Sequence, residues 1–298
     1  MAEALATPFF WFAGKVTMLN DSTWEDIAAA FEKARTRQPA LSELLDFYVK
    51  LVREQHAVAA NLQLAPFDEA LLRDRIEPGK PLLTRQEFPL DLLSADTLFR
   101  TLCRLAKERG PAVRAATEEI ESALGSGVLD LHDLLRGTVA EEGYPFAVAD
   151  QMALDPELLN TLAEASICPG IQARAKTLGS LVDNDWWLKS ICPICGSEPK
   201  FAELRGQELA ASRHLHCGFC GWAWPVRRLG CVFCENKDHN RLQTLIIENH
   251  LSCKLEVCDV CRRYLKLVDN KEFIGLIPEV EVLATPHLDL AAMERGYH

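Results

Sequence analysis

Four Cys-x-x-Cys pairs lie between residues 192 and 261: Cys192-Pro-Ile-Cys195, Cys217-Gly-Phe-Cys220, Cys231-Val-Phe-Cys234 and Cys258-Asp-Val-Cys261. They hold eight of the eleven cysteines in a chain of 298 residues, and 21, 10 and 23 residues separate successive pairs. A Cys-x-x-Cys step folds into a tight turn, here called a knuckle, that aims both sulfur atoms at one ion. The four knuckles therefore predict two tetracysteine metal sites in series.

Neighbouring knuckles in the sequence are predicted to share an ion. Site one is predicted to comprise Cys192, Cys195, Cys217 and Cys220, and site two Cys231, Cys234, Cys258 and Cys261. The 21- and 23-residue gaps are each long enough for a small hairpin, and the 10-residue gap connects two similar modules. This pattern indicates an internal duplication. Runs at 222–228, 242–247 and 264–268 are strand-like, and knuckles on short antiparallel strands are typical of rubredoxins and zinc ribbons.

Glycine follows the second cysteine of both knuckles in site one, at Gly196 and Gly221. Glycine tolerates a positive φ and lets the following N–H group approach sulfur. In site two these positions hold Glu235 and Arg262. Four cysteine ligands are therefore predicted at each site. The knuckle geometry is predicted with glycine only at site one.

Disulfide bonds are the alternative for eight paired cysteines, as in small secreted proteins. The cysteines occupy only one quarter of a large chain, and their spacing is that of metal ligands. The opening Met1-Ala-Glu-Ala-Leu has an acidic residue where a secretory signal has basic ones. We therefore expect metal binding and a reducing, cytoplasmic environment.

Three cysteines remain outside the pairs. Cys103 lies on an apolar helical stripe and is interpreted as a small buried hydrophobe. Cys168 precedes Pro169-Gly170 and is expected to close a helix. Cys253 has no assigned role, because Cys253-x4-Cys258-x2-Cys261 also matches the spacing of plant-type ferredoxins.

The sequence before the cysteines is predicted to be mainly α-helical. Ser22 and Glu25 are predicted to form a capping box. Further helices are expected at 41–62, near Ala70, at 94–109, from Pro111 to about Gly125 and from Pro156 to Pro169, with a short helix after Pro169. The predicted domains are a helical domain at 1–185, a rubredoxin-like tetracysteine module at 186–228, and a second such module at 229–298 that ends in a helical tail.

Charge and composition disfavour several classes of protein. The net charge is −11, yet residues 191–270 contain 11 Lys or Arg and 9 Asp or Glu, which leaves −13 on the rest. A divalent ion with four thiolates has a net charge of −2. Two occupied sites would therefore change the net charge of residues 191–270 from +2 to −2. Nucleic-acid binding needs a distinctly basic surface and is therefore not expected. No apolar run reaches 18 residues, so no membrane span is expected.

The sequence contains no recognisable catalytic constellation, and we expect a protein that is not an enzyme. Tetracysteine sites are closed and leave no position for a substrate. The cluster of Asp130, His132 and Asp133 lacks metal-site partners, and His56 fits packing or a surface position. Three histidines, His214, His216 and His239, flank the knuckles and are alternative ligands, although such residues more often lie beside a site or on the surface.

The cysteine-rich third resembles the FdhE family of formate dehydrogenase accessory proteins. The resemblance rests on Cys192-Pro-x-Cys-Gly-Ser-x-Pro199, on the four knuckles in this order, on Tyr264-Leu-Lys266 after the last knuckle, and on the tail Leu288-Asp289 and Met293-Glu-x-Gly296-Tyr297. The helical half resembles the family loosely, around Gly79-Lys-Pro-Leu-Leu83. The resemblance implies a cytoplasmic factor that binds the catalytic subunit of a respiratory formate dehydrogenase before export, and it favours iron over zinc in rubredoxin-like sites.

Three functions compete on this evidence. The chain can be a binding factor for an immature redox enzyme, a rubredoxin-like electron carrier acting during enzyme assembly, or a zinc-ribbon adaptor for nucleic acid or the transcription machinery. The charge disfavours the adaptor, while tetrathiolate geometry accepts zinc or iron. Candidates for a docking surface are the aromatic and arginine residues near the knuckles, Trp222, Trp224, Arg227, Arg228, Arg262, Arg263 and Tyr264, of which Trp224 is expected to pack inside its module.

Overall fold

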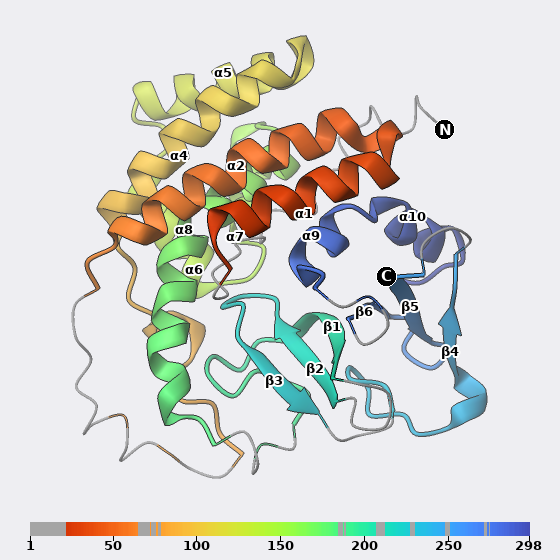
Figure 1. Ribbon diagram of the computed structural model, residues 1–298. Coiled ribbons are helices and arrows are strands. Elements are labelled where there is room, and N and C mark those ends of the chain that lie inside the picture. The colour runs from red at the N-terminus through yellow and green to blue at the C-terminus, as the bar shows by residue number, and fades with distance from the viewer. Residues whose placement is uncertain are drawn as a thin grey trace. The chain divides into compact units, whose positions relative to one another are not determined.

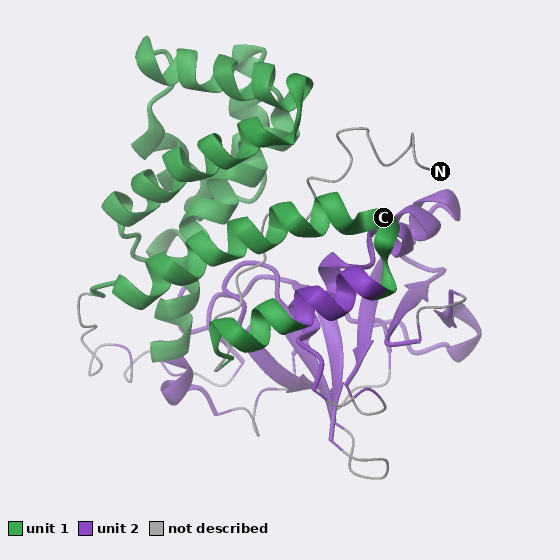
Figure 2. Cartoon of the chain, turned by 45° about the horizontal axis from the view of Figure 1, so that its top comes forward, with its two compact units in different colours: residues 1–29, 37–66, 84–177 green, residues 30–36, 67–83, 178–298 purple. Residues whose placement is uncertain are grey.

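The computed structural model describes residues 22–64, 72, 76, 79–183, 187, 189–206, 212–226, 230–247, 251–270, 273 and 275–298 (Figure 1). Two compact units divide the chain (Figure 2). Unit 1 comprises residues 1–29, 37–66 and 84–177, and unit 2 comprises residues 30–36, 67–83 and 178–298. All strands of the described chain lie in unit 2 and follow the longer helices, so the predicted fold class, mainly α before the cysteines and β around them, is confirmed.

The longer helices before the sheet are α1 Trp24–Arg37, α2 Ser42–Asn61, α4 Leu92–Ala106, α5 Pro111–Gly125, α6 Leu131–Ala140, α7 Tyr144–Met152 and α8 Pro156–Leu178. Short 3₁₀ turns lie at Pro39–Leu41, Arg85–Glu87, Lys107–Arg109 and Gly179–Leu181. Helix α4 packs against α2, α5 and α6, and its buried Phe99 and Leu102 belong to this contact region. The helices at 41–62, 94–109 and 111–125 are confirmed, whereas α6 and α7 were not predicted. The helix expected near Ala70 lies outside the described residues.

Several helix starts have side-chain caps. The Asp26 N–H donates to Thr23 Oγ1 at 3.2 Å, and the Thr23 N–H donates to Asp26 Oδ2 at 3.2 Å. The capping box is therefore one residue later than predicted for Ser22. Asp155 caps α8 by accepting from the Leu158 N–H at 2.8 Å, and the helix begins at Pro156 as predicted.

The small cluster of polar residues at Asp130 also has a local structural explanation. Asp130 caps α6 by accepting from the Asp133 N–H at 2.9 Å. His132 Nε2 lies 3.4 Å from Asp96 Oδ2 on α4. Asp130 therefore caps the start of α6, and His132 makes a surface contact between α6 and α4.

Helix α8 continues through Pro169 to Leu178, so the prediction that it ends at Pro169-Gly170 is wrong. Proline has no N–H group and leaves the carbonyl four residues earlier without its helical partner. That carbonyl belongs to Ala165, and it accepts a hydrogen bond of 2.7 Å from Nε2 of the fully buried Gln55 on α2. A side chain from another helix thus compensates for the proline, and no local sequence rule contains this information.

The sheet of unit 2 has six strands in the order β3-β2-β1-β6-β5-β4. The strands are β1 Pro199–Arg205, β2 Ser212–Cys217, β3 Ala223–Val226, β4 Leu242–Leu245, β5 Cys253–Cys258 and β6 Tyr264–Asp269. Strands β1, β2 and β3 form an antiparallel meander, as do β4, β5 and β6. The predicted runs at 222–228, 242–247 and 264–268 correspond to β3, β4 and β6; residues 227 and 228 lie outside the described chain.

The two meanders are repeats of one motif. In each repeat a knuckle precedes the first strand, and the third cysteine of the site ends the second strand. Cys217 pairs with Pro199 at the start of β1, and Cys258 pairs with Leu242 at the start of β4. The repeats join where β1 and β6 pair in parallel, with Phe201 opposite Lys266. The predicted duplication is therefore visible in the topology, and both modules share one sheet.

Helices α9 Pro278–Leu283 and α10 Pro286–Glu294 cover one face of this sheet (Figure 1). The hydrophobic core beneath them comprises Phe201, Cys253, Leu255, Val257, Val268, Val282, Leu288, Ala292 and Tyr297. The expected helical tail thus completes the core of the second module. Among the described residues, no helix is long and apolar enough to cross a membrane.

Candidate metal centres

All four knuckles have the same backbone hydrogen bonds. The N–H of the first cysteine donates to the carbonyl five residues later, and the N–H four residues later donates back to the carbonyl of that cysteine. The donor–acceptor distances lie between 2.8 and 3.3 Å in all four turns. Each pair of sulfur atoms is therefore held by a tight turn that is complete without an ion.

The residue after the second cysteine has a left-handed backbone in every knuckle. The φ angles are 74° at Gly196 and 71° at Gly221, and 57° at Glu235 and 59° at Arg262. A non-glycine residue in this conformation is destabilised by roughly 1–2 kcal/mol. The absence of glycine from site two therefore leaves the geometry unchanged, and its effect is on stability.

The knuckles bring the eight cysteines together in the two predicted groups of four. In each group of four, the sulfur atoms all lie within 4.8 Å of one another. The Sγ–Sγ distances are 3.4 Å for Cys195–Cys217, 3.6 Å for Cys192–Cys220 and 3.7 Å for Cys234–Cys258. A tetrahedron with metal–sulfur bonds of about 2.3 Å has edges of about 3.8 Å. The sulfur atoms are too far apart for disulfides, and each group can hold one metal ion.

The two groups differ in their exposure to solvent. Cys192, Cys195, Cys217 and Cys220 are 0, 4, 5 and 0% exposed. In the second group only Cys258 is buried, at 2%, whereas Cys231 and Cys261 are half-buried and Cys234 is exposed. The first group is thus enclosed by protein, and the second opens to solvent on the side of its first knuckle.

The environment of the thiols favours some thiolates over others. Burial raises the pKa of Cys192 and Cys220 well above the ordinary value. Burial also opposes ionisation of Cys195, but hydrogen bonds from Cys192, Cys217 and Cys220 hold its pKa well below the ordinary value. In the second group, burial opposes ionisation of Cys258, but backbone N–H groups of Cys261 and Val260 help to lower its pKa to about 7. Cysteine binds a metal ion as the thiolate, so loading either group releases protons from its thiols.

A short segment from before the sheet holds the first knuckle of site one. The Leu82 N–H donates to the Pro193 carbonyl at 3.0 Å, and the Leu83 N–H donates to the Ile194 carbonyl at 2.9 Å. A Cβ atom on Gly196 would lie 3.1 Å from Pro81 Cγ. The Gly79–Leu83 segment, part of the family resemblance, therefore has the structural role of fixing this knuckle.

Two tryptophans near the second knuckle of site one pack against neighbouring backbone. Trp224 is fully buried, as expected, and its indole N–H donates to the Lys189 carbonyl at 3.2 Å. The ring of Trp222 fills the space above Gly179, where an added Cβ would lie 2.1 Å from Trp222 Cη2. Trp224 therefore packs inside the unit, as expected, and the half-buried Trp222 packs against Gly179, while its docking role stays a prediction.

Arg262 ties the last knuckle of site two to residues 295–297. Its guanidinium donates to the Arg295 carbonyl at 2.7 Å and to Asp259 Oδ1 at 2.9 Å, and lies 4.2 Å from the centre of the Tyr297 ring. The Tyr297 hydroxyl donates to the same Asp259 oxygen at 2.8 Å. The contacts of Arg262 compensate for its left-handed backbone.

Two further residues of the family resemblance meet on the tail. The Tyr264 hydroxyl donates to Asp289 Oδ1 at 2.9 Å, and the buried Lys266 ammonium donates to Asp289 Oδ2 at 2.6 Å. The motif after the last knuckle and the Leu288-Asp289 motif are thus two halves of one contact. Tyr264 and Arg262 were expected on a docking surface. Tyr264 is half-buried and Arg262 is exposed, both have partners within the unit, and their docking role stays a prediction.

Arg263 joins the two sites. Its guanidinium binds both carboxylate oxygens of Glu198 and lies 3.7 Å from the centre of the Phe233 ring. The Glu198 carbonyl accepts from the Gly218 N–H in the second knuckle, and the Arg263 carbonyl accepts from the Cys258 N–H in the fourth. Arg263 is therefore a structural link between modules; Arg227 and Arg228, the other arginines expected to dock a partner, lie outside the described residues.

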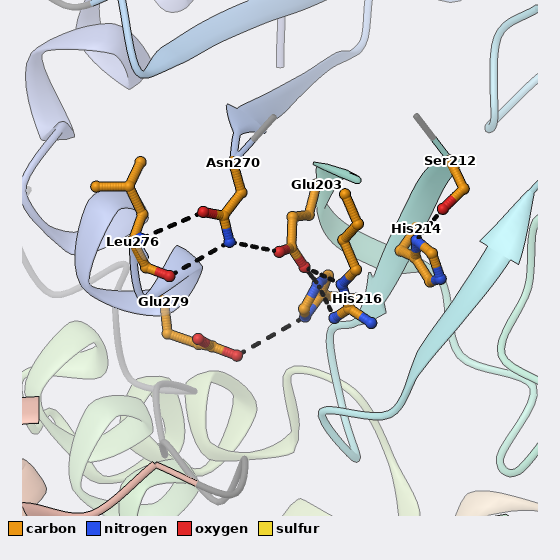
Figure 3. Close-up of polar contacts among 8 residues, drawn as sticks. Glu203, Ser212, His214, His216, Asn270, Leu276 and Glu279 are labelled. Atoms are coloured by element: carbon orange, nitrogen blue, oxygen red, sulfur yellow. Dashed lines mark hydrogen bonds and ion pairs between the residues drawn. The ribbon is translucent and has the colours of Figure 1, made fainter. Parts of the chain in front are cut away.

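A buried polar network lies on the sheet face under α9 (Figure 3). Glu203 on β1 accepts from His216 on β2 at 2.9 Å and from Asn270 at 2.9 Å, and Arg205 lies 2.6 Å away. Burial opposes ionisation of Glu203, but these donors lower its pKa to about 2. The charged carboxylate therefore contributes stability above its ordinary pKa, and this contribution is lost as the pH falls toward 2.

The flanking histidines are not ligands in this arrangement, since the two groups contain only cysteine within the described ranges. His216 belongs to the Glu203 network, and His239 lines a hollow beside site two. Cys103 is buried in α4, as predicted. Cys168 is buried inside α8, so the expectation that it closes a helix is wrong. Cys253 is fully buried in the sheet core with Thr285 Oγ1 at 3.8 Å, outside both groups.

The fold defines a protein with a helical N-terminal part and a C-terminal sheet that carries two tetracysteine groups, each able to hold a metal ion. Residues 191–228 match the family model described as FdhE, central domain. "Protein FdhE homolog" of Aquifex aeolicus is 25% identical over 260 residues, covering 86% of this chain and 83% of the relative. "Protein FdhE" of Escherichia coli K12 is 26% identical over 261 residues, covering 86% and 79%. These matches confirm the resemblance of this chain to the FdhE family.

The crystal structure of the FdhE protein from Pseudomonas aeruginosa has the same fold. It superimposes with a TM-score of 0.64, and the match covers 94% of this chain and 95% of that one at 24% identity. The similarity therefore extends over the helical half as well as the cysteine-rich sheet.

Proposed function

We propose that this chain is a non-enzymatic accessory factor that binds the catalytic subunit of a respiratory formate dehydrogenase in the cytoplasm before export. It carries one ion in each cysteine group, and iron is favoured over zinc by the family resemblance. The observation that carries the proposal is the arrangement of two tetracysteine groups on one continuous sheet. Closed tetrathiolate sites build a rigid surface and leave no coordination position for a substrate.

The proposal is tested by capture of the catalytic subunit. The tagged chain is produced with that subunit, purified without oxygen, and analysed for bound partner and metal. Cys234→Ser removes one ligand of the exposed group, and Val128→Ala changes an exposed residue between α5 and α6 as a control. We expect capture by the wild type and the control and weaker capture by Cys234→Ser. Failure of the metal-loaded wild type to capture the subunit would contradict the proposal.

An electron carrier is the second candidate, and the exposure of Cys234 is the observation in its favour. An ion that exchanges electrons with a partner must approach the surface, as site two does. Zinc has no redox chemistry, so a zinc-loaded chain can bind a partner but cannot transfer electrons to it. If the zinc-loaded chain captures the catalytic subunit as well as the iron-loaded chain and supports its maturation equally, the binding role suffices. If only iron supports maturation, the electron-carrier role is favoured.

A further inference from the structure

The two cysteine groups have the same backbone geometry and opposite exposure. We infer that the groups have different roles: the ion of site one is permanent, and the ion of site two is exchangeable and controls the shape of the surface around Cys234. The inference rests on the proposed metal binding and extends it to regulation. Capture of the partner would then depend on the supply of metal to site two alone.

Release of an ion from site one requires unfolding. All four sulfur-bearing residues are at most 5% exposed, so no donor atom of a competing ligand reaches the ion in the folded chain. The first knuckle is also fixed by backbone hydrogen bonds to Leu82 and Leu83. An ion that leaves must be replaced by protons on the buried sulfur atoms, because bare thiolates in that environment are strongly unfavourable. Its release is therefore limited by opening of the sheet.

Site two can be reached without unfolding. Cys234 is exposed, and Cys231 and Cys258 line a hollow of about 210 Å³. Phe233, Leu242 and Leu265 contribute apolar surface to the same hollow. A chelating group can approach from this side, and the thiolate of Cys234 can be solvated as it leaves the ion.

The structure also indicates which part moves when the ion leaves. The fourth knuckle is held by the contacts of Arg262 with residues 295–297 and by the Cys258 pairing at the end of β5. The third knuckle, Cys231–Cys234, is held by its own turn and by the stacking of Phe233 under Arg263. Loss of the ion should therefore loosen the third knuckle and leave the sheet intact. The exposed surface around Cys234 then differs between the loaded and unloaded states.

The test follows zinc release from the full chain loaded with two equivalents, using excess chelator and a chromogenic zinc indicator. We expect two phases of one equivalent each, separated by tenfold or more in rate. N-ethylmaleimide added after the fast phase identifies the emptied group by peptide mass mapping. We expect modification of Cys231 and Cys234, in the loosened third knuckle, before the four cysteines of site one.

Matched variants complete the experiment, since Cys195 and Cys234 hold equivalent positions in the repeat. Cys234→Ser should remain folded, retain one ion, and release it at the slow wild-type rate. Cys195→Ser should lose the slow phase and become sensitive to proteolysis in the sheet. Equal release rates, or modification of site one first, would overturn the inference. A chain that holds no ion at all would instead contradict the proposed metal binding. Failure of the inferred difference between the sites can therefore be told apart from failure of metal binding itself.

Discussion

The guanidinium of Arg263 donates to both carboxylate oxygens of Glu198, at 2.9 and 2.6 Å, and so connects the two cysteine modules. Both side chains are partly exposed, and a two-point ion pair of this kind contributes on the order of 0.5–1 kcal/mol. The pair should therefore couple the modules measurably without being essential for folding.

A double-mutant cycle tests this link. Arg263→Ala and Glu198→Ala should each lower the unfolding free energy of the metal-loaded sheet, and the double variant should lose about 0.5–1 kcal/mol less than the sum. Denaturant unfolding followed by tryptophan fluorescence provides the measurement. Phe233→Leu is the control, because it removes the aromatic ring beside the Arg263 guanidinium and leaves both partners of the ion pair in place. Strict additivity of the two single changes would show that the ion pair carries no coupling.

Substitutions at the left-handed residue after a knuckle should change the stability of the sheet in opposite directions in the two modules. Glu235→Gly should stabilise the sheet by about 1 kcal/mol, because glycine adopts a φ of 57° without strain. Gly196→Ala should destabilise it by about 1–2 kcal/mol, and the contact with Pro81 adds to this loss. Thermal unfolding of the loaded proteins measures both. An unchanged melting temperature in Gly196→Ala would show that the left-handed backbone at this position carries no strain for alanine.

The hydrogen bond from Gln55 Nε2 to the Ala165 carbonyl should stabilise the helical unit only because Pro169 has no N–H group to donate to that carbonyl. Gln55→Leu leaves that buried carbonyl without a partner and should destabilise the helical unit by about 1–3 kcal/mol. In a Pro169→Ala background the helix supplies its own N–H donor, so the effect of Gln55→Leu should shrink. Urea unfolding followed by far-ultraviolet circular dichroism measures the four proteins. An equal loss in both backgrounds would refute the explanation.

The shared sheet predicts that damage at site one spreads to site two. Cys192→Ser should remove the first ion and also weaken retention of the second, since β1 pairs directly with β6. Cys231→Ser should leave the first ion in place. Metal content after gel filtration in the presence of a weak chelator measures this asymmetry. Retention of the second ion at wild-type strength in Cys192→Ser would indicate two independent modules.

The sequence predicts the parts that depend on local rules. The spacing of the eight cysteines predicts both groups, and proline and glycine at 110–111 and 125–127 predict the ends of α4 and α5. The parallel pairing of β1 with β6 has no local signal, because it joins residues far apart in the chain, such as Phe201 and Lys266. The continuation of α8 through Pro169 depends on a side chain from α2, and the roles of Arg262 and Arg263 depend on contacts that only the fold creates. The boundaries predicted at residues 185 and 228 remain a prediction.

The most direct test of the account is native mass spectrometry of the anaerobically purified full chain. We predict two bound metal ions in the wild type, and one in Cys234→Ser with the remaining ion in the group of Cys192, Cys195, Cys217 and Cys220. Absence of metal from the wild type, or a single ion shared between Cys192/Cys195 and Cys231/Cys234, would contradict the account.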